Sequence, residues 1–264
     1  MKRAMPSQTA SISSGMSNAN AAMTLYLLRT RKTAGYRGCR PGCNACRIGA
    51  LAAEQWNGEP RRPGHMTVAP PPSPAAAPPP AGFRDLLTPE LIGWRVAGKG
   101  GFRWMPPGVL ESFGGPGLFW YANETFDDFI LDVSWRTLHP DDNSGVFLRC
   151  PPLQDTPALA IAQGYEVQID DRGFDPKTRC TGSALHLTGA VYRLAPAAAG
   201  LSHPVGEWNR FVITACAQTI SVVLNGAPAA RLEHGDRARS GHVALQCHHE
   251  GSAVQFRHVA IKPL

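Results

Sequence analysis

The sequence predicts an all-β fold for residues 83–264, a jelly-roll sandwich of two antiparallel sheets. Two observations favour this fold class. Apolar and polar residues alternate with a period of two along many short segments, and Gly, Pro and Asn-Gly turn signals separate these segments. No apolar pattern predicts a helix of ten or more residues here. A length of about 180 residues is large for an immunoglobulin-like sandwich and suits a jelly roll.

Each strand is expected from its own alternation. The segment 128–136 (DFILDVSWR) places Phe129, Leu131, Val133 and Trp135 on one face, and 242–248 (HVALQCH) alternates in the same way. The segment 219–224 (TISVVL) leads into Asn225-Gly226, which predicts a tight hairpin because both positions tolerate positive φ. The remaining strands are expected, in chain order, near 102–105, 108–113, 117–121, 145–149, 164–171, 189–193, 207–215 and 253–262.

Three parts of the chain differ in composition. Residues 1–68 are expected to be a disordered or non-native leader, 69–82 a Pro/Ala-rich linker with seven prolines in APPPSPAAAPPP, and 83–264 the folded domain. Translation could instead begin at Met66. No stretch reaches the ~20 apolar residues of a membrane-spanning helix. The short apolar run 21–28 lies far from Lys2 and Arg3 and gives no clear signal peptide.

The positive charge is confined to the front of the chain. Residues 1–82 hold ten Lys/Arg and two acids, whereas 83–264 hold sixteen Lys/Arg and eighteen acids. A nucleic-acid site requires clustered Lys/Arg to neutralise phosphates. The composition of the domain therefore excludes nucleic acid as its partner.

Three cysteines in the leader resemble a metal motif. Cys39, Cys43 and Cys46 have the C-x3-C-x2-C spacing of cluster-binding radical S-adenosylmethionine enzymes, and His65 could complete a zinc site. Those enzymes need a βα barrel, and an all-β pattern follows here. The preferred interpretation is three cysteines in an unstructured leader, and no metal ligands are assigned.

Polar side chains are expected to gather on one face of a sheet. Three strands carry them opposite their apolar residues: NSGVFLR, GYEVQIDD and HVALQCH. If these strands share a sheet, the face could bind a neutral, polyhydroxylated ligand. Solvated strand positions and inter-strand ion pairs are the alternative interpretation. The candidate residues are Asn143, Arg149, Glu166, Gln168, Asp170, Gln246 and His248.

The order of seven motifs closely resembles the 3-keto-disaccharide hydrolase domain family. They are DDFILDVSWR, NSGVFLR, GYEVQIDD, TGAVY, GEWNRFVI, ISVVLNG and VALQCHHEGSAVQFRHVAIKPL, and they cover nearly all of 83–264. The resemblance implies a concanavalin-like jelly roll, shared with lectins and laminarinase-type glucanases. It also implies a carbohydrate partner and a periplasmic or extracellular location, although a cytoplasmic one remains open. Cys247 stands where the family usually has an acid.

The resemblance implies cleavage of glycosides whose sugar carries a ketone at C3. A C3 ketone acidifies the C2 proton, so a base can remove it, the C1 substituent can leave by elimination, and water can then add. Glu166 or His248 is the expected base and Arg149 the expected enolate stabiliser. Substrate hydroxyls are assigned to Asn143, Gln168, Asp170 and Gln246. A divalent cation could replace Arg149, but the sequence requires none.

Two other functions stay open at this stage. E-V-Q-I-D is similar to the E-x-D-x-E strand of laminarinase-type glycosidases, but Glu166 and Asp170 would lie ~13 Å apart at Cα, far for a retaining pair. A lectin-like module would use the same fold and face for binding without turnover. A linker-tethered structural module would show no affinity for sugar.

Overall fold

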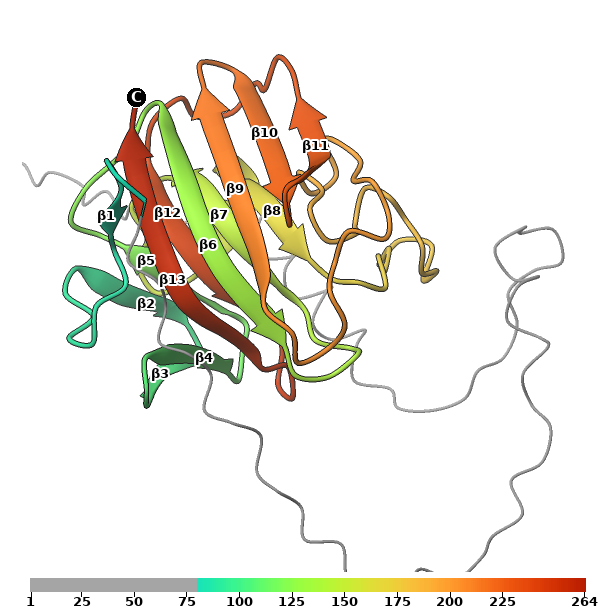
Figure 1. Cartoon of the computed structure of the whole chain (residues 1–264), viewed down its shortest axis with the longest axis horizontal. Coiled ribbons are helices and arrows are strands. Elements are labelled where there is room, and N and C mark those ends of the chain that lie inside the picture. The colour runs from blue at the N-terminus through green and yellow to red at the C-terminus, as the bar shows by residue number, and fades with distance from the viewer. Residues whose placement is uncertain (1–79) are drawn as a thin grey trace, which may run out of the picture. The chain divides into compact units, whose positions relative to one another are not determined.

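The computed structural model describes residues 80–264, which fold as a concanavalin-like jelly roll of two antiparallel sheets (Figure 1). The predicted fold class is confirmed. One sheet has the order β11 (Ala227–Leu232), β10 (Thr219–Leu224), β9 (Asn209–Cys216), β6 (Phe129–Thr137), β13 (Val254–Pro263), β4 (Val109–Phe113) and β3 (Gly101–Met105), with β1 (Arg84–Asp85) beside β13. The other has the order β2 (Trp94–Gly98), β5 (Gly117–Tyr121), β12 (His242–Cys247), β7 (Ser144–Cys150) and β8 (Tyr165–Ile169).

The core lies between the two sheets, and strand alternation builds it. On β6, Phe129, Leu131, Val133 and Trp135 are fully buried. The facing sheet contributes residues such as Val146, Leu148, Val167 and Leu245 to the same cluster. Full burial of one such side chain is worth ~1.5–3 kcal/mol, so the alternation fixes which face of each strand turns inward.

The hairpin between β10 and β11 forms at the predicted position. Asn225 has φ 51° and Gly226 has φ 84°. Two consecutive residues with positive φ give the turn a twist that matches the strands it joins. The Asn225 side chain also accepts from the Arg210 N–H at 2.9 Å, which ties the turn back to β9.

The strand expected at 189–193 was wrong. This segment makes isolated bridges, Val191 with Val167 and with Ala195, rather than a continuous ladder. The Tyr192 N–H still donates to the Glu166 carbonyl at 2.8 Å, so the segment covers the edge of β8. Pairing ends at Arg193, where φ is 62°. The sequence analysis also missed β1, β2, β11 and the one-and-a-half-turn helix α2 (Ala158–Gln163).

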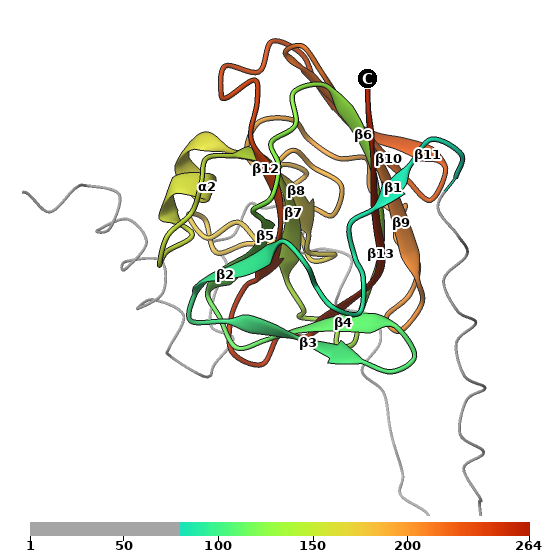
Figure 2. The same ribbon diagram turned by 90° about the vertical axis from the view of Figure 1, so that its left-hand side faces the viewer.

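The helix α2 lies on the outer side of the five-stranded sheet (Figure 2). Ala160 of α2 and Leu153 before it pack with Trp120 and Phe147, side chains on the outer face of that sheet. Part of this outer face is therefore covered by the chain itself.

The predictions for the leader lie outside the described residues. They concern 1–68, most of 69–82, the alternative start at Met66, and the motif of Cys39, Cys43 and Cys46 with His65. The division into leader, linker and domain therefore stays a prediction. Within residues 80–264, no helix is long and apolar enough to cross a membrane.

Candidate functional site

Strand register brings three of the candidate side chains onto the outer face of the five-stranded sheet. Glu166 pairs with Phe147, and Gln168 pairs with Gly145. On the other side of β7, Ala244 pairs with Phe147, which places Gln246 in line with Gly145 two residues further along β12. Residues that pair directly across antiparallel strands share a face. Glu166, Gln168 and Gln246 therefore face the same side of the sheet.

Glu166 lies over the backbone of β7, in the space that a Cβ at residue 145 would occupy. A Cβ added to Gly145 would come within 2.5 Å of Glu166 Oε1 and 2.9 Å of its Cγ. With the Gln168 amide oriented to satisfy both of its ends, its nitrogen donates to Glu166 Oε1 at 3.2 Å and to the Ser144 carbonyl at 3.0 Å. Glycine thus makes room for the carboxyl, and the neighbouring amide fixes its position.

The surroundings of Glu166 make its carboxyl a weaker acid than an ordinary glutamic acid. Burial raises the pKa of Glu166 to about 8, although the charges of Arg193 and Arg237 act in the opposite direction. Arg237 is held in place because its side chain donates to the Gly164 carbonyl and its backbone N–H donates to the Tyr165 hydroxyl at 2.7 Å. A carboxyl with a pKa near neutrality can exchange a proton with substrate at physiological pH.

A second polar group lies where the same face ends, and we call it the end cluster: Asn143, Asp170, Arg172, His248 and His249. Asp170 is fully buried, and its two carboxylate oxygens accept from Asn143 Nδ2 at 3.2 Å, the Phe174 N–H at 3.2 Å and the Arg172 N–H at 3.0 Å. Asp170 therefore organises the loop after β8 more than it faces solvent.

His248 is neutral at physiological pH. Burial lowers its pKa to about 3, and the nearby charges of His249 and Arg172 add to this effect. Its Nδ1 lies 2.9 Å from His249 Nδ1, so one of the two nitrogens carries the shared hydrogen. A neutral imidazole here can donate or accept a hydrogen bond, but it cannot supply a positive charge.

Two buried amide oxygens on this side of the sheet have no partner among the described residues. They are Asn143 Oδ1 and Gln246 Oε1. Buried acceptors are nearly always hydrogen-bonded in native proteins, and an unpaired one calls for a missing donor. An ordered water or a ligand hydroxyl would supply such a donor.

Arg149 does not join this face. It is 1% exposed, has φ 53°, and its guanidinium donates to the carbonyl oxygens of Asp127 at 2.6 Å and Ala217 at 2.7 Å and to Asp128 Oδ1 at 3.0 Å. The charges that act on Glu166 are those of Arg193 and Arg237 instead. The expectation that Arg149 shares the polar face is corrected, because positive φ and the bulge between the His242 and Ala244 pairings redirect its side chain.

Cys247 also points away from the polar side chains. Its thiol is fully buried, and a Cβ added to Gly100 would lie 2.2 Å from its sulfur. Burial raises the pKa of Cys247 to about 12. An acid at this position would be enclosed on the inner side of β12, so the departure from the family pattern does not remove a group from the polar face.

A cation site is not evident from side-chain clusters in residues 80–264. No group of three or more His, Cys, Asp or Glu side chains there could hold a metal ion. The predicted alternative of a divalent cation thus gains no ligand set from the described residues.

Sequence reasoning missed the arginines around both polar groups. Arg193 and Arg237 beside Glu166, and Arg172 beside His248, all come from loops rather than strands. Alternation along a strand gives no information about loop residues. Gly145 was visible as part of NSGVFLR, but its steric role depends on the pairing with β8.

A jelly-roll sandwich with a carboxyl, two amides and a histidine along one sheet face suits a carbohydrate-active domain. The comparisons agree: the family described as 3-keto-alpha-glucoside-1,2-lyase-like domain matches residues 82–262, and the chain belongs to this family. The suspected family is thereby confirmed. Among curated proteins, none matches the chain.

Solved structures show the same fold. A candidate glycosyl hydrolase of Parabacteroides distasonis ATCC 8503 is 22% identical, with 69% of this chain and 99% of the other covered and a TM-score of 0.57. A second candidate glycosyl hydrolase of the same organism is 19% identical, with 69% and 94% covered and a TM-score of 0.59. At these identities the likeness establishes the architecture alone.

Proposed function

We propose that this domain cleaves the glycosidic bond of 3-keto-glycosides or 3-keto-disaccharides, with Glu166 as the general base. The observation that carries the proposal is the seating of Glu166 over Gly145 on the polar face, beside the Gln168 amide. Family membership over residues 82–262 supports the substrate class. A carboxylate whose conjugate acid has a pKa of about 8 is a stronger base toward a C–H bond than an ordinary carboxylate.

The reaction proceeds by elimination and hydration. Glu166 takes the C2 proton, the C2–H electron pair forms the enolate with the C3 ketone, and the C1–O bond then breaks as the C1=C2 double bond forms. The leaving alkoxide takes the proton held by Glu166 and departs as an alcohol, which restores the Glu166 carboxylate. Glu166 then takes a proton from water as hydroxide adds to C1, and it returns this proton to C2. The sum is hydrolysis of one glycosidic bond.

The other residues bind and orient the sugar in this proposal. Asn143 and Gln246 accept hydrogen bonds from its hydroxyls, since their amide oxygens are otherwise unpaired. The Gln168 amide donates a hydrogen bond to Glu166 and so orients it. Neutral His248, in the end cluster, completes the polar face. Arg193 and Arg237 are placed to offset negative charge on the enolate, the role first expected of Arg149.

Three measurements on the purified full chain test the proposal. Glucose release from 3-keto-trehalose, with none from trehalose, is the expected substrate pattern. Glu166→Gln should reduce kcat/KM by about 10²–10⁴-fold, the usual contribution of a positioned base. In the wild type, kcat/KM should rise with pH and level off above about pH 8, because only deprotonated Glu166 can accept the proton. Full turnover by Glu166→Gln would remove Glu166 from the mechanism.

A lectin-like module is the competing function. The unpaired oxygens of Asn143 and Gln246 would also suit binding without turnover. Trehalose or 3-keto-trehalose that binds but is never cleaved would favour this alternative. Laminarinase-type chemistry is disfavoured, because Asp170 is fully buried and both of its carboxylate oxygens already accept hydrogen bonds within the protein.

A further inference from the structure

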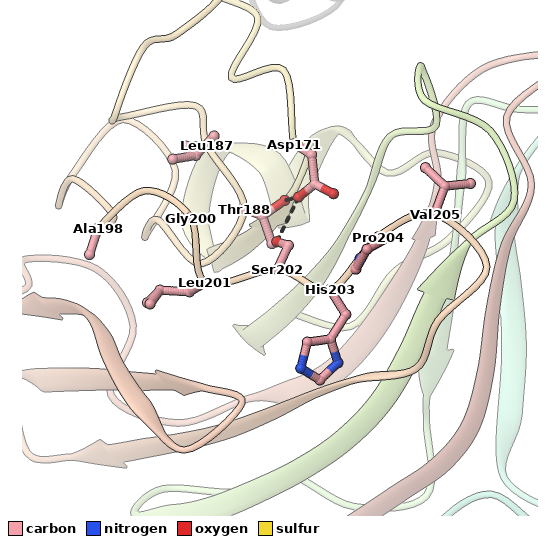
Figure 3. Close-up of a pocket in the computed structure, with 10 residues that line it drawn as sticks. All are labelled: Asp171, Leu187, Thr188, Ala198, Gly200, Leu201, Ser202, His203, Pro204 and Val205. Carbon is pink, nitrogen blue, oxygen red and sulfur yellow. Dashed lines mark hydrogen bonds between the residues drawn. The ribbon is translucent and has the colours of Figure 1, made fainter.

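A groove lies beside the end cluster and is not used by the mechanism above. Its larger hollow, of about 370 Å³, lies under the loop that leads into β9 (Figure 3). Its smaller hollow, of about 230 Å³, lies beside the turn that follows β6. Asp171 and Val205 line both hollows, so the two adjoin at these residues. We refer to both hollows together as the groove.

The groove adjoins the proposed active face through Arg172 and Asp142. Both line the smaller hollow. The charge of Arg172 acts on His248 and His249, and Asp142 is the direct neighbour of Asn143 in the chain. Along β8, Glu166 and Asp170 are ~13 Å apart at Cα, a separation that a disaccharide can span. A sugar ring beside Glu166 could thus extend its second ring toward Asp171.

The lining of the groove combines hydrogen-bonding groups with apolar surface. Asp171 Oδ1 accepts from the hydroxyls of Thr188 at 2.6 Å and Ser202 at 2.7 Å, as the dashed lines in Figure 3 show. These two bonds occupy one carboxylate oxygen and fix the loop around Ser202. Leu201 and Val205 supply apolar surface, and Val205 is 43% exposed.

We propose that the groove binds the leaving-group sugar of the substrate, a neutral pyranose ring; this rests on the proposed function. The volume of its larger hollow lies within the ~300–1,000 Å³ of small-molecule sites. A pyranose presents hydroxyls at its rim and C–H groups on its face, which match the Asp171 carboxylate and the Val205 methyls. The smaller hollow is lined by two acids, Asp142 and Asp171, and by Arg172, and this excess of negative charge favours a neutral ligand over an anion.

The test compares two substrates that differ only in the leaving group. 3-Keto-trehalose has a glucose leaving group, and methyl 3-keto-α-glucoside has methanol. Val205→Trp fills the groove with an indole ring. The ratio of kcat/KM for the disaccharide to that for the methyl glycoside should fall at least tenfold. Val96→Trp is the matched control, because Val96 is 47% exposed on β2 and lies outside the groove lining; it should leave the ratio unchanged.

A second variant and a binding measurement test the groove if Val205→Trp does not fold or if the wild type is inactive. Asp171→Asn retains the shape of the side chain and removes its charge, and it should lower the same ratio. This variant replaces Val205→Trp in the test if Val205→Trp does not fold. An unchanged ratio in a folded Val205→Trp variant overturns the groove proposal and leaves the proposed function standing. If the wild type cleaves neither substrate, the proposed function fails. The groove is then judged by NMR titration with trehalose, where the absence of shifts at Leu201 and Val205 overturns it.

Discussion

Gly145 shows how one missing side chain can make room for a carboxyl from the neighbouring strand. The Glu166 carboxyl occupies the space that a Cβ at residue 145 would take, on the strand next to its own. Such a contact depends on cross-strand register and not on the local sequence of β8. Gly145 is therefore as important to the proposed chemistry as Glu166, although it supplies no functional group.

Gly145→Ala should test this relation. The new methyl group would lie 2.5 Å from the present position of Glu166 Oε1, so the carboxyl must move. We expect kcat/KM on 3-keto-trehalose to fall by at least about tenfold, because small misplacements of a base are costly. The free energy of unfolding should change by less than about 1 kcal/mol, since φ of Gly145 is not in the left-handed region and a flexible side chain can give way. Activity equal to wild type would show that Glu166 does not need its present position.

At the scale of the elements, Arg149 of β7 joins the five-stranded sheet to the eight-stranded sheet, two sheets whose strands do not pair with each other. It follows the regular part of β7 and bonds to the segment before β6 and to the turn between β9 and β10. A buried guanidinium with several carbonyl and carboxylate acceptors is costly to remove, because its partners are left without donors. The same geometry explains why Arg149 is not on the polar face.

Arg149→Met should therefore destabilise the fold by roughly 3–5 kcal/mol, the range for the loss of one partner from a buried charged pair. Chemical denaturation measures this loss directly. Arg84→Met is the matched control, since Arg84 pairs with Glu124 at the surface with side chains 53% and 41% exposed. That change should cost less than about 1 kcal/mol. If Arg149→Met is as stable as the control variant, the structural role assigned to Arg149 is wrong.

The whole molecule should lose stability in acid because of a charged group within the eight-stranded sheet. Asp132 on β6 bonds to Arg210 of β9 and lies 3.8 Å from His258 of β13. Burial alone would raise the pKa of Asp132, but the hydrogen bonds and charge of Arg210, together with the nearby His258, outweigh it and lower the pKa to about 2. A depressed carboxylate pKa means that the folded state binds fewer protons than the unfolded state.

The expected outcome is a decrease in the free energy of unfolding as pH falls from about 4 toward 2. Asp132 contributes its full stabilisation above its unfolded pKa, and the contribution is lost as pH falls through the folded value. Asp132→Asn should be less stable at pH 6 and should show a shallower decrease in acid. Urea titrations at several pH values provide the measurement. Parallel pH curves for the wild type and Asp132→Asn would contradict this assignment.

Much of the architecture was predictable because strands with one buried face show period-two alternation in the sequence, and tight turns require particular residues. Alternation in 128–136 and 219–224 predicted β6 and β10. Asn225-Gly226 predicted the hairpin turn that joins β10 to β11. The strand predicted at 189–193 was wrong, because this alternating segment forms only isolated bridges and contains a residue with positive φ. The edge strands β2 and β11 were missed because short edge strands carry little alternation.

The sequence by itself determined the fold class, the family and the strand faces that carry Glu166, Gln168 and Gln246, because periodicity and motif order are properties of the chain alone. Only the tertiary structure decided what those side chains meet. Pairing of β7 with β8 placed Glu166 over Gly145, and loops brought Arg193 and Arg237 beside it. Positive φ turned Arg149 inward. Burial, pKa and neighbours depend on segments far apart in sequence, and no local pattern encodes them.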